Sequence, residues 1–434
     1  MFTIEHATLT DVGVRRSHNQ DAHAVVLGRP EDSGRVGHVF VVADGMGGHA
    51  VGEMASAMAV SVIPHLYQKH ASQGPAKALR IAFREANAAI HERGTKNPEF
   101  RDMGTTTTAL VLREDGAWIG HVGDSRAYRI RDGRVEQLSF DHSLVWELAR
   151  RKHVSPSQIQ DVPNNVIVRS LGPAATVEVD VEGPHPFRTG DVFVICSDGL
   201  SGQVSDQELG AAASLLPPAE ACRFLVDLAN LHGGPDNITV AIVRVVEGAS
   251  AGQAPPPRPP WYRRIPWPIG VLSLGVLFAA AATGLIYHQQ TDLGELLFGL
   301  SALTLIAGIA SLVIYHRREQ QRLEMEEPEE PVHRRVYRHA PCSVDGPLLE
   351  KLARLEARLV HCAHERHWEV DWATYQRHHA AAKRARMAQD FETQFREMAR
   401  ALRPLVEALA KVRHKEEAFD PQWEPESPPD AGQS

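Results

Sequence analysis

Residues 39–53 read VFVVADGMGGHAVGE, an apolar run that ends in Asp44 and continues into glycines. Two further apolar runs end in the same way, HVGDS at Asp124 and VFVICSDG at Asp198. Consecutive apolar residues bounded by glycine predict short strands that are buried on both faces. An aspartate at the end of each strand predicts a cluster of carboxylates at one edge of the core.

Carboxylates that lie close together repel one another and raise each other's pKa unless a cation compensates them. Such a cluster suits hard divalent ions with oxygen ligands, so we expect Mg²⁺ or Mn²⁺. Gly45 after Asp44 allows a sharp backbone turn that directs a carbonyl oxygen at the ion. A DG pair is otherwise typical of a hairpin turn, which we expect for Asp115–Gly116 and Asp132–Gly133, each between two strand-like runs.

The chain contains, in this order, the segments GVRRSHNQDA, VVADGMGGHAVGE, MGTTTTAL, VGDSRAYRI, VIVRSLG, ICSDGLSGQVSDQE and GPDNITVAIV. Over about residues 8–246 it therefore resembles the metal-dependent protein phosphatase family (type 2C, PPM), in particular its bacterial members. The resemblance implies an α+β fold, a four-layer α-β-β-α sandwich with a two-metal site at one end. It implies nothing about the chain beyond residue 246.

The resemblance also assigns roles to individual residues. Asp44 would bridge two Mn²⁺ or Mg²⁺ ions, and the Gly45 carbonyl would bind one of them. Asp198 and Asp236 would hold the other ion. The implied reaction is hydrolysis of phosphoserine or phosphothreonine by in-line attack of a water that bridges the two ions.

Two more carboxylates belong to the implied metal site. Asp21 would orient a metal-bound water, and Asp124 would join Asp198 in a weaker site for a third ion. The chain departs from the family at Gln20, where many relatives have glutamate. A glutamine carries no charge, so we expect fewer anionic ligands for the second ion, without loss of activity.

Arg16 and His49 are the implied substrate-side residues. The planar guanidinium of Arg16 would bind the substrate phosphate, whereas its neighbour Arg15 is interpreted as a solvated surface charge. His49 is the nearest candidate for the acid that protonates the leaving group. The alternative for His49 is a histidine at a helix N-terminus that contacts substrate or solvent and transfers no proton.

Two segments near these motifs receive opposite interpretations. Thr105 to Thr108 are β-branched residues that predict the start of a strand. Asp141 to Asn164 form a polar insertion before VIVRSLG, which we interpret as a flap over the site.

Composition limits the partners and the compartment. The formal net charge is -8, which provides no basic footprint for nucleic acid. The four cysteines show neither CxxC spacing nor the density of a disulfide scaffold, so we expect a reducing compartment. The N-terminal residues lack the basic start and apolar core of a secretory signal. We therefore expect residues 1–247, the phosphatase-like domain, in the cytosol.

The composition changes after this domain. Residues 248–268 are rich in proline and predict a semi-rigid linker. Residues 269–287 and 296–315 are uncharged apolar runs, each close to the roughly 20 residues that cross a bilayer, and they predict two transmembrane helices joined by the short external loop 288–295. A buried helical hairpin of a soluble protein is the alternative.

The charges around the two runs predict their orientation. Arginines flank the outer ends of the pair, and the loop between them contains Asp292 and Glu295 but neither lysine nor arginine. By the positive-inside rule, both outer ends face the cytoplasm. We therefore expect a multi-pass protein of the cell inner membrane, with its N- and C-terminal parts on the cytoplasmic side.

The chain beyond the second run is expected to be mostly helical. After a charged linker at 316–345, residues 346–415 contain two heptad seams, which predict coiled-coil-like helices that pack as an antiparallel pair or between subunits. Histidines gather here as well, but their spacing spreads them around a helix, so we interpret them as surface residues. Residues 416–434 predict a disordered tail.

These observations favour a membrane-tethered, metal-dependent protein serine/threonine phosphatase that acts on phosphoproteins and opposes serine/threonine kinases. The alternative class is a binding module without turnover, but such a domain would be expected to lose Asp44, Asp198 or Asp236. A phosphatase acting on cyclic dinucleotides or other small molecules is a further alternative.

Overall fold

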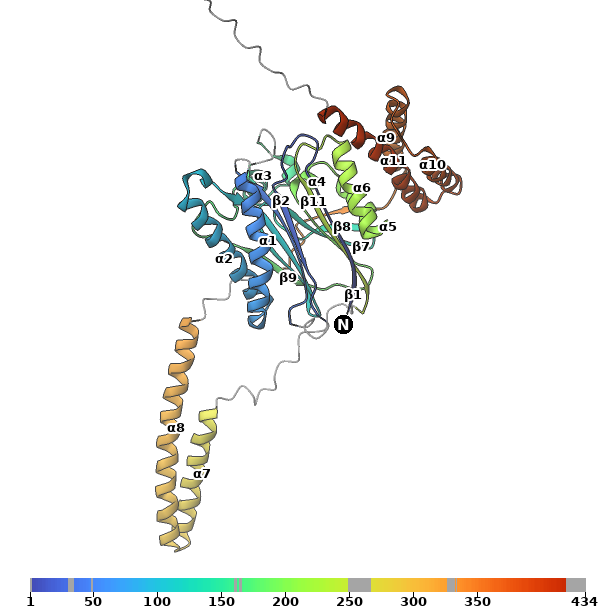
Figure 1. The fold of residues 1–434 in the computed structure, drawn as a ribbon. Coiled ribbons are helices and arrows are strands. Elements are labelled where there is room, and N and C mark those ends of the chain that lie inside the picture. Colours follow the sequence, from blue (N-terminus) through green and yellow to red (C-terminus); the bar gives the residue numbers. More distant parts are fainter. Residues whose placement is uncertain are drawn as a thin grey trace, which may run out of the picture. The chain divides into compact units, whose positions relative to one another are not determined.

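The computed structural model describes residues 2–29, 35–47, 50–159, 162–163, 166–248, 267–325, 332 and 334–418. The chain forms two compact units (Figure 1). One unit combines Met1–Gly252 with Val332–Ser434, and the other is Gln253–Pro331. The first unit is therefore built from one segment that precedes the second unit in the sequence and one that follows it.

The described strands of the first unit form two antiparallel sheets. The first sheet has the order β1 (Thr3–Asp11), β11 (Ile238–Glu247), β10 (Val192–Cys196), β7 (Arg126–Arg131), β8 (Arg134–Gln137) and β12 (Arg338–Pro341). The second has the order β2 (Asp21–Val26), β3 (His38–Met46), β5 (Thr107–Arg113), β6 (Gly116–Val122) and β9 (Asp180–His185), and β4 (Gly104–Thr105) pairs with β3. The turns at Asp115–Gly116 and Asp132–Gly133 join paired strands, as predicted.

Strand β10 illustrates why the apolar runs are continuous. Phe193 and Ile195 belong to a core that they share with residues of the other sheet, such as Phe40. Val192 and Val194 point to the opposite face and join the core beneath the helices. Since successive side chains of a strand alternate between faces, a strand buried on both faces needs apolar residues at every position.

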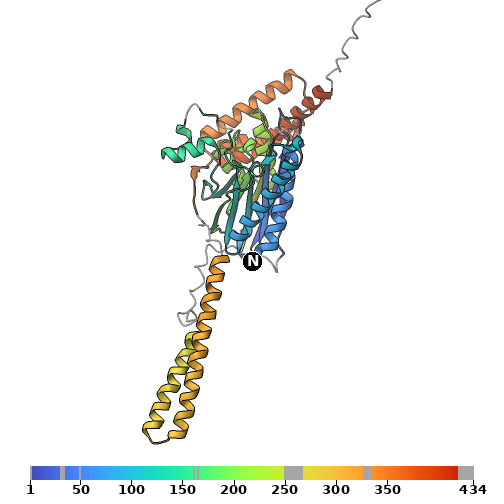
Figure 2. The same cartoon turned by 90° about the vertical axis from the view of Figure 1, so that its left-hand side faces the viewer.

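Helices cover the outer faces of both sheets (Figures 1 and 2). Those packed on the second sheet are α1 (Ala50–His70) and α2 (Pro75–Lys96), and those packed on the first sheet are α5 (Asp206–Leu215) and α6 (Pro218–Leu231). The remaining short helices of this part are η2 (Ala71–Gln73), η3 (Pro98–Phe100), α3 (Leu144–Lys152), η4 (Pro156–Gln158) and α4 (Asp198–Ser201). The predicted α+β class is confirmed.

The second unit contains two apolar helices, α7 (Trp267–Tyr287) and α8 (Thr291–Met325), which run side by side as a hairpin (Figure 1). Both are long and apolar enough to cross a membrane. Gly275 and Gly308 allow close approach, because a Cβ at either position would meet a leucine of the other helix. The hydroxyl of Ser301 donates a 2.8 Å hydrogen bond to the Gly275 carbonyl. Small residues and such bonds are typical of helix pairs in membranes.

The C-terminal segment belongs to the phosphatase-like unit. It contributes β12 and the helices α9 (Gly346–Glu365), α10 (Trp372–Met387) and α11 (Phe391–Ala418). Leu352 and Leu359 of one heptad seam and Phe395 and Leu405 of the other are buried in the same core as α5 and α6. The seams are thus used within the chain, and the sequence interpretation missed both α10 and β12.

Charged contacts reinforce this packing. Lys351 of α9 forms a 2.7 Å ion pair with Glu208 of α5, whose side chain is 1% exposed. Arg400 of α11 forms a 3.0 Å ion pair with Glu220 of α6. Lys351 therefore compensates the charge of a buried carboxylate, while the apolar core that α9 shares with α5 and α6 makes it part of the unit.

Candidate metal centre

The predicted carboxylates come from elements of both sheets. Asp21 begins β2, Asp44 lies in β3, and the two are directly opposite each other in the antiparallel ladder. Asp124 lies in the turn between β6 and β7, Asp198 begins α4, and Asp236 immediately precedes the residues that enter β11. Electrostatic repulsion from each of the other four acts on Asp44, which shows that the five carboxylates form one cluster.

Burial and mutual repulsion make this cluster unfavourable for ionised carboxylates. The pKa of Asp21 is raised to about 7, first by burial and then by Asp198 and Asp236. The pKa of Asp124 is also raised to about 7, by burial and by Asp198 and Asp141. A negative charge at these positions therefore needs a compensating cation.

Asp44 and Asp198 show the same effect. Burial raises the pKa of Asp44 well above its usual range, and the neighbouring carboxylates raise it further. Burial and Asp236 raise the pKa of Asp198, whereas hydrogen bonding with the Asp44 side chain lowers it. Without a cation, both carboxyls therefore favour the protonated form.

Several carboxylate oxygens of the cluster lack any partner. Oδ1 of Asp21, Oδ1 of Asp124 and Oδ1 of Asp198 are buried and accept no hydrogen bond from the described residues. Buried polar atoms are normally satisfied, so each unsatisfied one marks a place for a water, ion or ligand. Unpartnered carboxylate oxygens around a repulsive cluster fit a hard divalent cation.

The carboxylate oxygens of this cluster are chemically suited to such an ion, but the described side chains do not converge on one centre. Among the described residues, no group of three or more His, Cys, Asp or Glu side chains is arranged to hold a metal ion as it stands. A bound cation would compensate the repulsion between the carboxylates and so favour their convergence on one centre.

Neighbouring polar residues fix the backbone of the cluster. The carbonyl of Asp44 accepts hydrogen bonds of 2.8 Å from the Thr106 N–H and from the Thr105 hydroxyl. The Ser197 hydroxyl donates a 2.7 Å bond to Asp21 Oδ2, and its oxygen accepts from the Thr239 N–H at 2.9 Å. These contacts position Asp44 and Asp21 before any ion binds.

The structure gives a steric reason for glycine at position 45, in addition to the expected role of its carbonyl. A Cβ at this position would lie 2.1 Å from the Gly52 carbonyl oxygen and 2.6 Å from that of Gln20. The Gly45 N–H also donates a 3.0 Å bond to the Gln20 carbonyl. The first turn of α1 therefore packs directly on this part of β3, and only a residue without a side chain fits.

Arg16 contacts one of the predicted metal ligands. Its Nη2 donates a 2.7 Å hydrogen bond to Asp236 Oδ2, and the Arg16 side chain is 49% exposed. Arg15 is exposed, as expected for a solvated residue. The guanidinium of Arg16 is thus held at the carboxylate cluster with part of its surface open to a ligand.

Asn237 is an organising residue that the sequence interpretation missed. Its Oδ1 accepts a 2.8 Å bond from the Gln20 N–H, and its Nδ2 donates at 2.9 Å to the carbonyls of Val12 and His18. It therefore shapes the loop that carries Arg16. The signal was present as an asparagine between a metal-type aspartate and an apolar strand, in the segment GPDNITVAIV.

Other predicted residues contribute less to the site. His49 lies outside the described residues. The side chain of Gln20 donates a 3.3 Å hydrogen bond to the Gly47 carbonyl. The C-terminal histidines have separate partners, since His378 pairs with Glu397 and His379 with Glu356.

The comparisons with known proteins agree with this geometry. A family model described as protein phosphatase 2C matches residues 14–229. A putative 2C-type protein phosphatase of Streptococcus pyogenes is 36% identical over 242 residues, which cover 54% of this chain and 94% of the relative. The serine/threonine protein phosphatase PstP of Mycobacterium tuberculosis is 32% identical over 246 residues, or 57% of this chain. This chain spans about half (46%) of that relative's length.

Solved structures give the same result. The crystal structure of the Mycobacterium tuberculosis phosphatase PstP has a TM-score of 0.50 at 32% identity, and the match covers 56% of this chain and 99% of that one. The PstP catalytic domain has also been solved in complex with two manganese ions, with a TM-score of 0.48, 32% identity and coverage of 57% and 100%. The carboxylate cluster, the order of the motifs and these matches together show that the chain belongs to the protein phosphatase 2C family.

Proposed function

We propose that this chain is a membrane-tethered protein serine/threonine phosphatase that hydrolyses phosphoserine and phosphothreonine in phosphoproteins and opposes serine/threonine kinases. The observation that carries the proposal is the cluster of Asp21, Asp44, Asp124 and Asp198 with its unpartnered oxygens. Family members named as serine/threonine phosphatases share this part of the chain.

Two ions, Mn²⁺ or Mg²⁺, would be held by Asp44, Gly45, Asp198 and Asp236, with Asp124 at a weaker third site. When bound, such ions lower the pKa of a coordinated water and neutralise charge on phosphoryl oxygens. Asp21 lies next to this group, where its free oxygen can accept a proton from water or hold it by a hydrogen bond. These roles rest on the carboxylate chemistry and on family resemblance.

Arg16 is proposed to bind the substrate phosphate. A guanidinium can donate two parallel hydrogen bonds to a phosphate, and Arg16 has donors left besides the one that contacts Asp236. His49 remains the proposed acid for the leaving group, on the basis of its position in GGHAVGE alone.

The catalytic unit is proposed to have the four-layer α-β-β-α sandwich of the family. Support comes from the shared core between the two sheets and from the separate cores beneath α1 with α2 and α5 with α6. The site then lies at one end of the sandwich, at the edge where β2 begins and β3 ends.

The membrane tether is proposed from the two apolar helices α7 and α8. Their leucines and isoleucines are exposed, with Leu277 at 65% and Leu296 at 71%, which fits contact with lipid. The segments before and after the pair belong to one compact unit, so they must lie on the same side of a membrane. The arginine flanks favour the cytoplasmic side of the inner membrane.

The test is hydrolysis of a phosphothreonine peptide by the full chain in detergent, with Mn²⁺ and with EDTA. We expect Mn²⁺-dependent release of phosphate that is lost in Asp44→Asn and in Asp198→Ala. A far-UV spectrum and melting curve establish that these variants fold. Activity equal to that of the wild type in both variants would refute the metal site, and a folded wild type that binds the peptide without turnover would favour the binding module.

A further inference from the structure

The segment that follows the hairpin, residues 334–341, packs on the catalytic unit close to the candidate metal centre. Strand β12 pairs with β8 at the edge of the first sheet, with Arg338 opposite Gln137. Arg338 also forms a 2.7 Å ion pair with Asp206 at the start of α5. The returning chain is therefore fixed within a few residues of Ser139 and Asp141, which follow β8.

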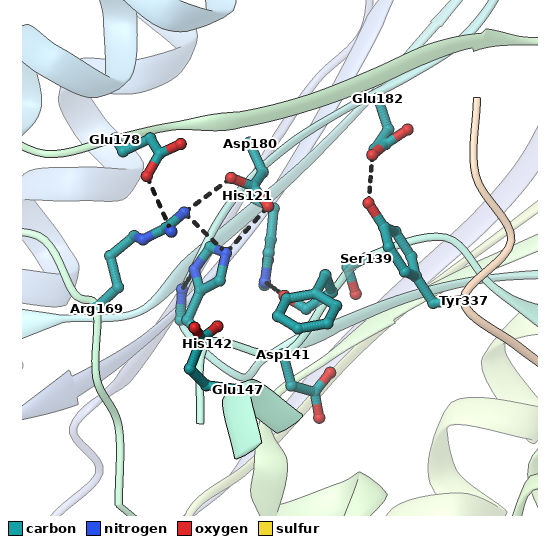
Figure 3. A network of polar contacts seen from close by, with 12 residues as sticks. His121, Ser139, Asp141, His142, Glu147, Arg169, Glu178, Asp180, Glu182 and Tyr337 are labelled. Atoms are coloured by element: carbon teal, nitrogen blue, oxygen red, sulfur yellow. Dashed lines mark hydrogen bonds and ion pairs between the residues drawn. The ribbon is translucent and has the colours of Figure 1, made fainter. Parts of the chain in front are cut away.

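Tyr337 joins this segment to the catalytic unit through hydrogen bonds and ring packing. Its hydroxyl donates a hydrogen bond to Oε1 of Glu182 (Figure 3). Oε2 of Glu182 accepts a bond from the Arg335 N–H at 3.1 Å. The Tyr337 N–H donates a 2.9 Å bond to the Gln137 carbonyl. Burial and Glu182 raise the pKa of Tyr337, so the hydroxyl keeps its proton and remains a donor. The ring packs on Phe140 with centroids 5.5 Å apart.

Phe140 connects Tyr337 to the metal-site turn. Its carbonyl accepts a 2.9 Å bond from His121 Nε2, and two residues later the His142 N–H donates a 2.7 Å bond to the Gly123 carbonyl. The Gly123 N–H donates back to His142 Nδ1 at 2.9 Å. His142 thus holds both backbone polar groups of Gly123, the residue that immediately precedes Asp124.

Strand β9 supports both ends of this connection (Figure 3). Asp180 and Glu182 are two positions apart, so their side chains leave the same face of the strand. Asp180 accepts a 3.1 Å bond from His142 Nε2 and a 2.8 Å bond from Arg169, and Glu182 accepts from Tyr337. One rigid strand therefore aligns the returning segment with the residue that holds the Asp124 turn.

We propose that Tyr337 is a positioning residue for Asp124, so that the segment returning from the hairpin sets the strength of the weaker metal site. The path runs from the Tyr337–Glu182 bond through Phe140 to His142 and the Gly123–Asp124 turn. The inference deepens the proposed function, because it rests on Asp124 being a metal ligand. It makes the anchored segment a part of the catalytic machinery that a chain without residues 332–418 would lack.

The test is the substitution Tyr337→Phe in the full chain, with Mn²⁺ binding measured from the electron paramagnetic resonance signal of free Mn²⁺. The substitution keeps the ring and removes the hydroxyl. Loss of a direct partner of a metal ligand typically weakens metal binding by 10- to 100-fold. Tyr337 acts through Phe140 and His142, so we expect an effect at the lower end of this range, at most about tenfold at the weakest site. The Mn²⁺ concentration for half-maximal phosphatase activity should rise in parallel.

The matched control is Tyr375→Phe, which removes another tyrosine hydroxyl of the C-terminal segment. Tyr375 contacts His379 on its own helix and lies beside Glu356 of α9. We expect Tyr375→Phe to leave the Mn²⁺ titration unchanged. Equal weakening by both substitutions, or no weakening by Tyr337→Phe, would overturn the proposal.

A double-mutant cycle tests the route of the effect. In an Asp124→Asn background, Tyr337→Phe should have no further effect on the remaining Mn²⁺ sites, because the residue it positions is gone. A tenfold effect that persists in this background would show that Tyr337 acts on the whole unit. If the wild type binds Mn²⁺ but hydrolyses no phosphopeptide, the proposed function fails, while the Mn²⁺ titration still decides the role of Tyr337.

Discussion

Ser197 donates a 2.7 Å hydrogen bond to Oδ2 of Asp21, while Oδ1 of the same buried carboxylate has no partner among the described residues. One oxygen is therefore fixed and the other is left free. An unsatisfied buried acceptor costs about 1–3 kcal/mol, more when it is charged. Such a cost is typical of a group that is pre-positioned for a ligand.

Because of the carboxylate cluster, the substitution Asp44→Asn should change stability in opposite directions with and without metal. Asp44→Asn removes a carboxyl whose ionisation is made unfavourable by burial and by repulsion from Asp21, Asp124 and Asp198. In EDTA, we expect the variant to melt at a higher temperature than the wild type. With Mn²⁺, the wild type should gain stability with ion concentration, since the ion binds only the folded state, and the variant should gain much less.

Melting curves of both proteins in EDTA and across a Mn²⁺ series measure this effect. A suitable control is Glu99→Gln, which changes an exposed carboxylate on η3. If Asp44→Asn melts below the wild type in EDTA, repulsion in the cluster does not limit stability and the electrostatic account is wrong.

Arg16 should matter for substrate affinity. Arg16→Ala removes a guanidinium whose charged hydrogen bonds to a phosphate are worth about 1.5–3 kcal/mol, so kcat/KM for a phosphothreonine peptide should fall about 10- to 100-fold. The fall should appear mainly in KM. Arg15→Ala is the control, because Arg15 is exposed and should change kcat/KM little. Equal effects of the two substitutions would remove Arg16 from the phosphate site.

The C-terminal helices should contribute to the stability of the catalytic unit. Leu405 is fully buried in the core that α11 shares with α5 and α6. Leu405→Ala should lower the free energy of unfolding by about 2–5 kcal/mol, the usual range for a large-to-small change in a core. Met387→Ala is the control, since Met387 is 76% exposed. Urea unfolding followed by phosphatase activity would reveal whether the catalytic unit unfolds with the helices, and an unchanged midpoint in Leu405→Ala would show that they are independent.

The hairpin should place its loop on the far side of the membrane from both flanking segments. A cysteine at Gln289, between α7 and α8, should react in intact cells with a thiol reagent that does not cross the inner membrane. A cysteine at the exposed Gln73 of the catalytic unit should react only after lysis. Labelling of both cysteines in intact cells, or of neither, would contradict the proposed topology.

The sequence was sufficient for much of the site because the motifs are local. Each apolar run that ends in an aspartate became a strand or strand end, and Asp21, Asp44, Asp124, Asp198 and Asp236 do lie in one cluster. The consecutive apolar residues of these runs also predicted strands that are buried on both faces. These features follow from residues that are neighbours in the chain.

Features that depend on distant residues were not predictable in the same way. The four residues of β12 become a strand only because β8 offers an open edge, and nothing in RHAP alone indicates this pairing. Helix α10 has no strong apolar seam in its sequence, and it packs mainly on α11, which is distant information that the local pattern does not contain. The need for glycine at position 45 comes from the carbonyls of Gly52 and Gln20, which meet it only in the folded chain.

Asp227 should make stability depend on pH through a group outside the metal centre. It lies on α6 beside a cavity of about 530 Å³ next to α10 and α11, and burial, with repulsion from Asp11 and Glu407, raises its pKa from 3.8 to about 7. Between these two values the folded state keeps the proton that the unfolded state releases, so this group lowers stability progressively as pH rises from about 4 to about 7.

Asp227→Asn removes this dependence and leaves the other titrating groups in place. Its melting temperature should therefore exceed that of the wild type at pH 8, and the difference should shrink toward zero near pH 4, where both proteins carry a neutral side chain. Melting curves at pH 5, 6.5 and 8 in EDTA measure the trend, with Glu99→Gln as the control for a general charge effect. A constant difference across this range would mean that Asp227 ionises at the same pH in the folded and unfolded chains, because only a shifted pKa makes the contribution of the carboxyl change with pH.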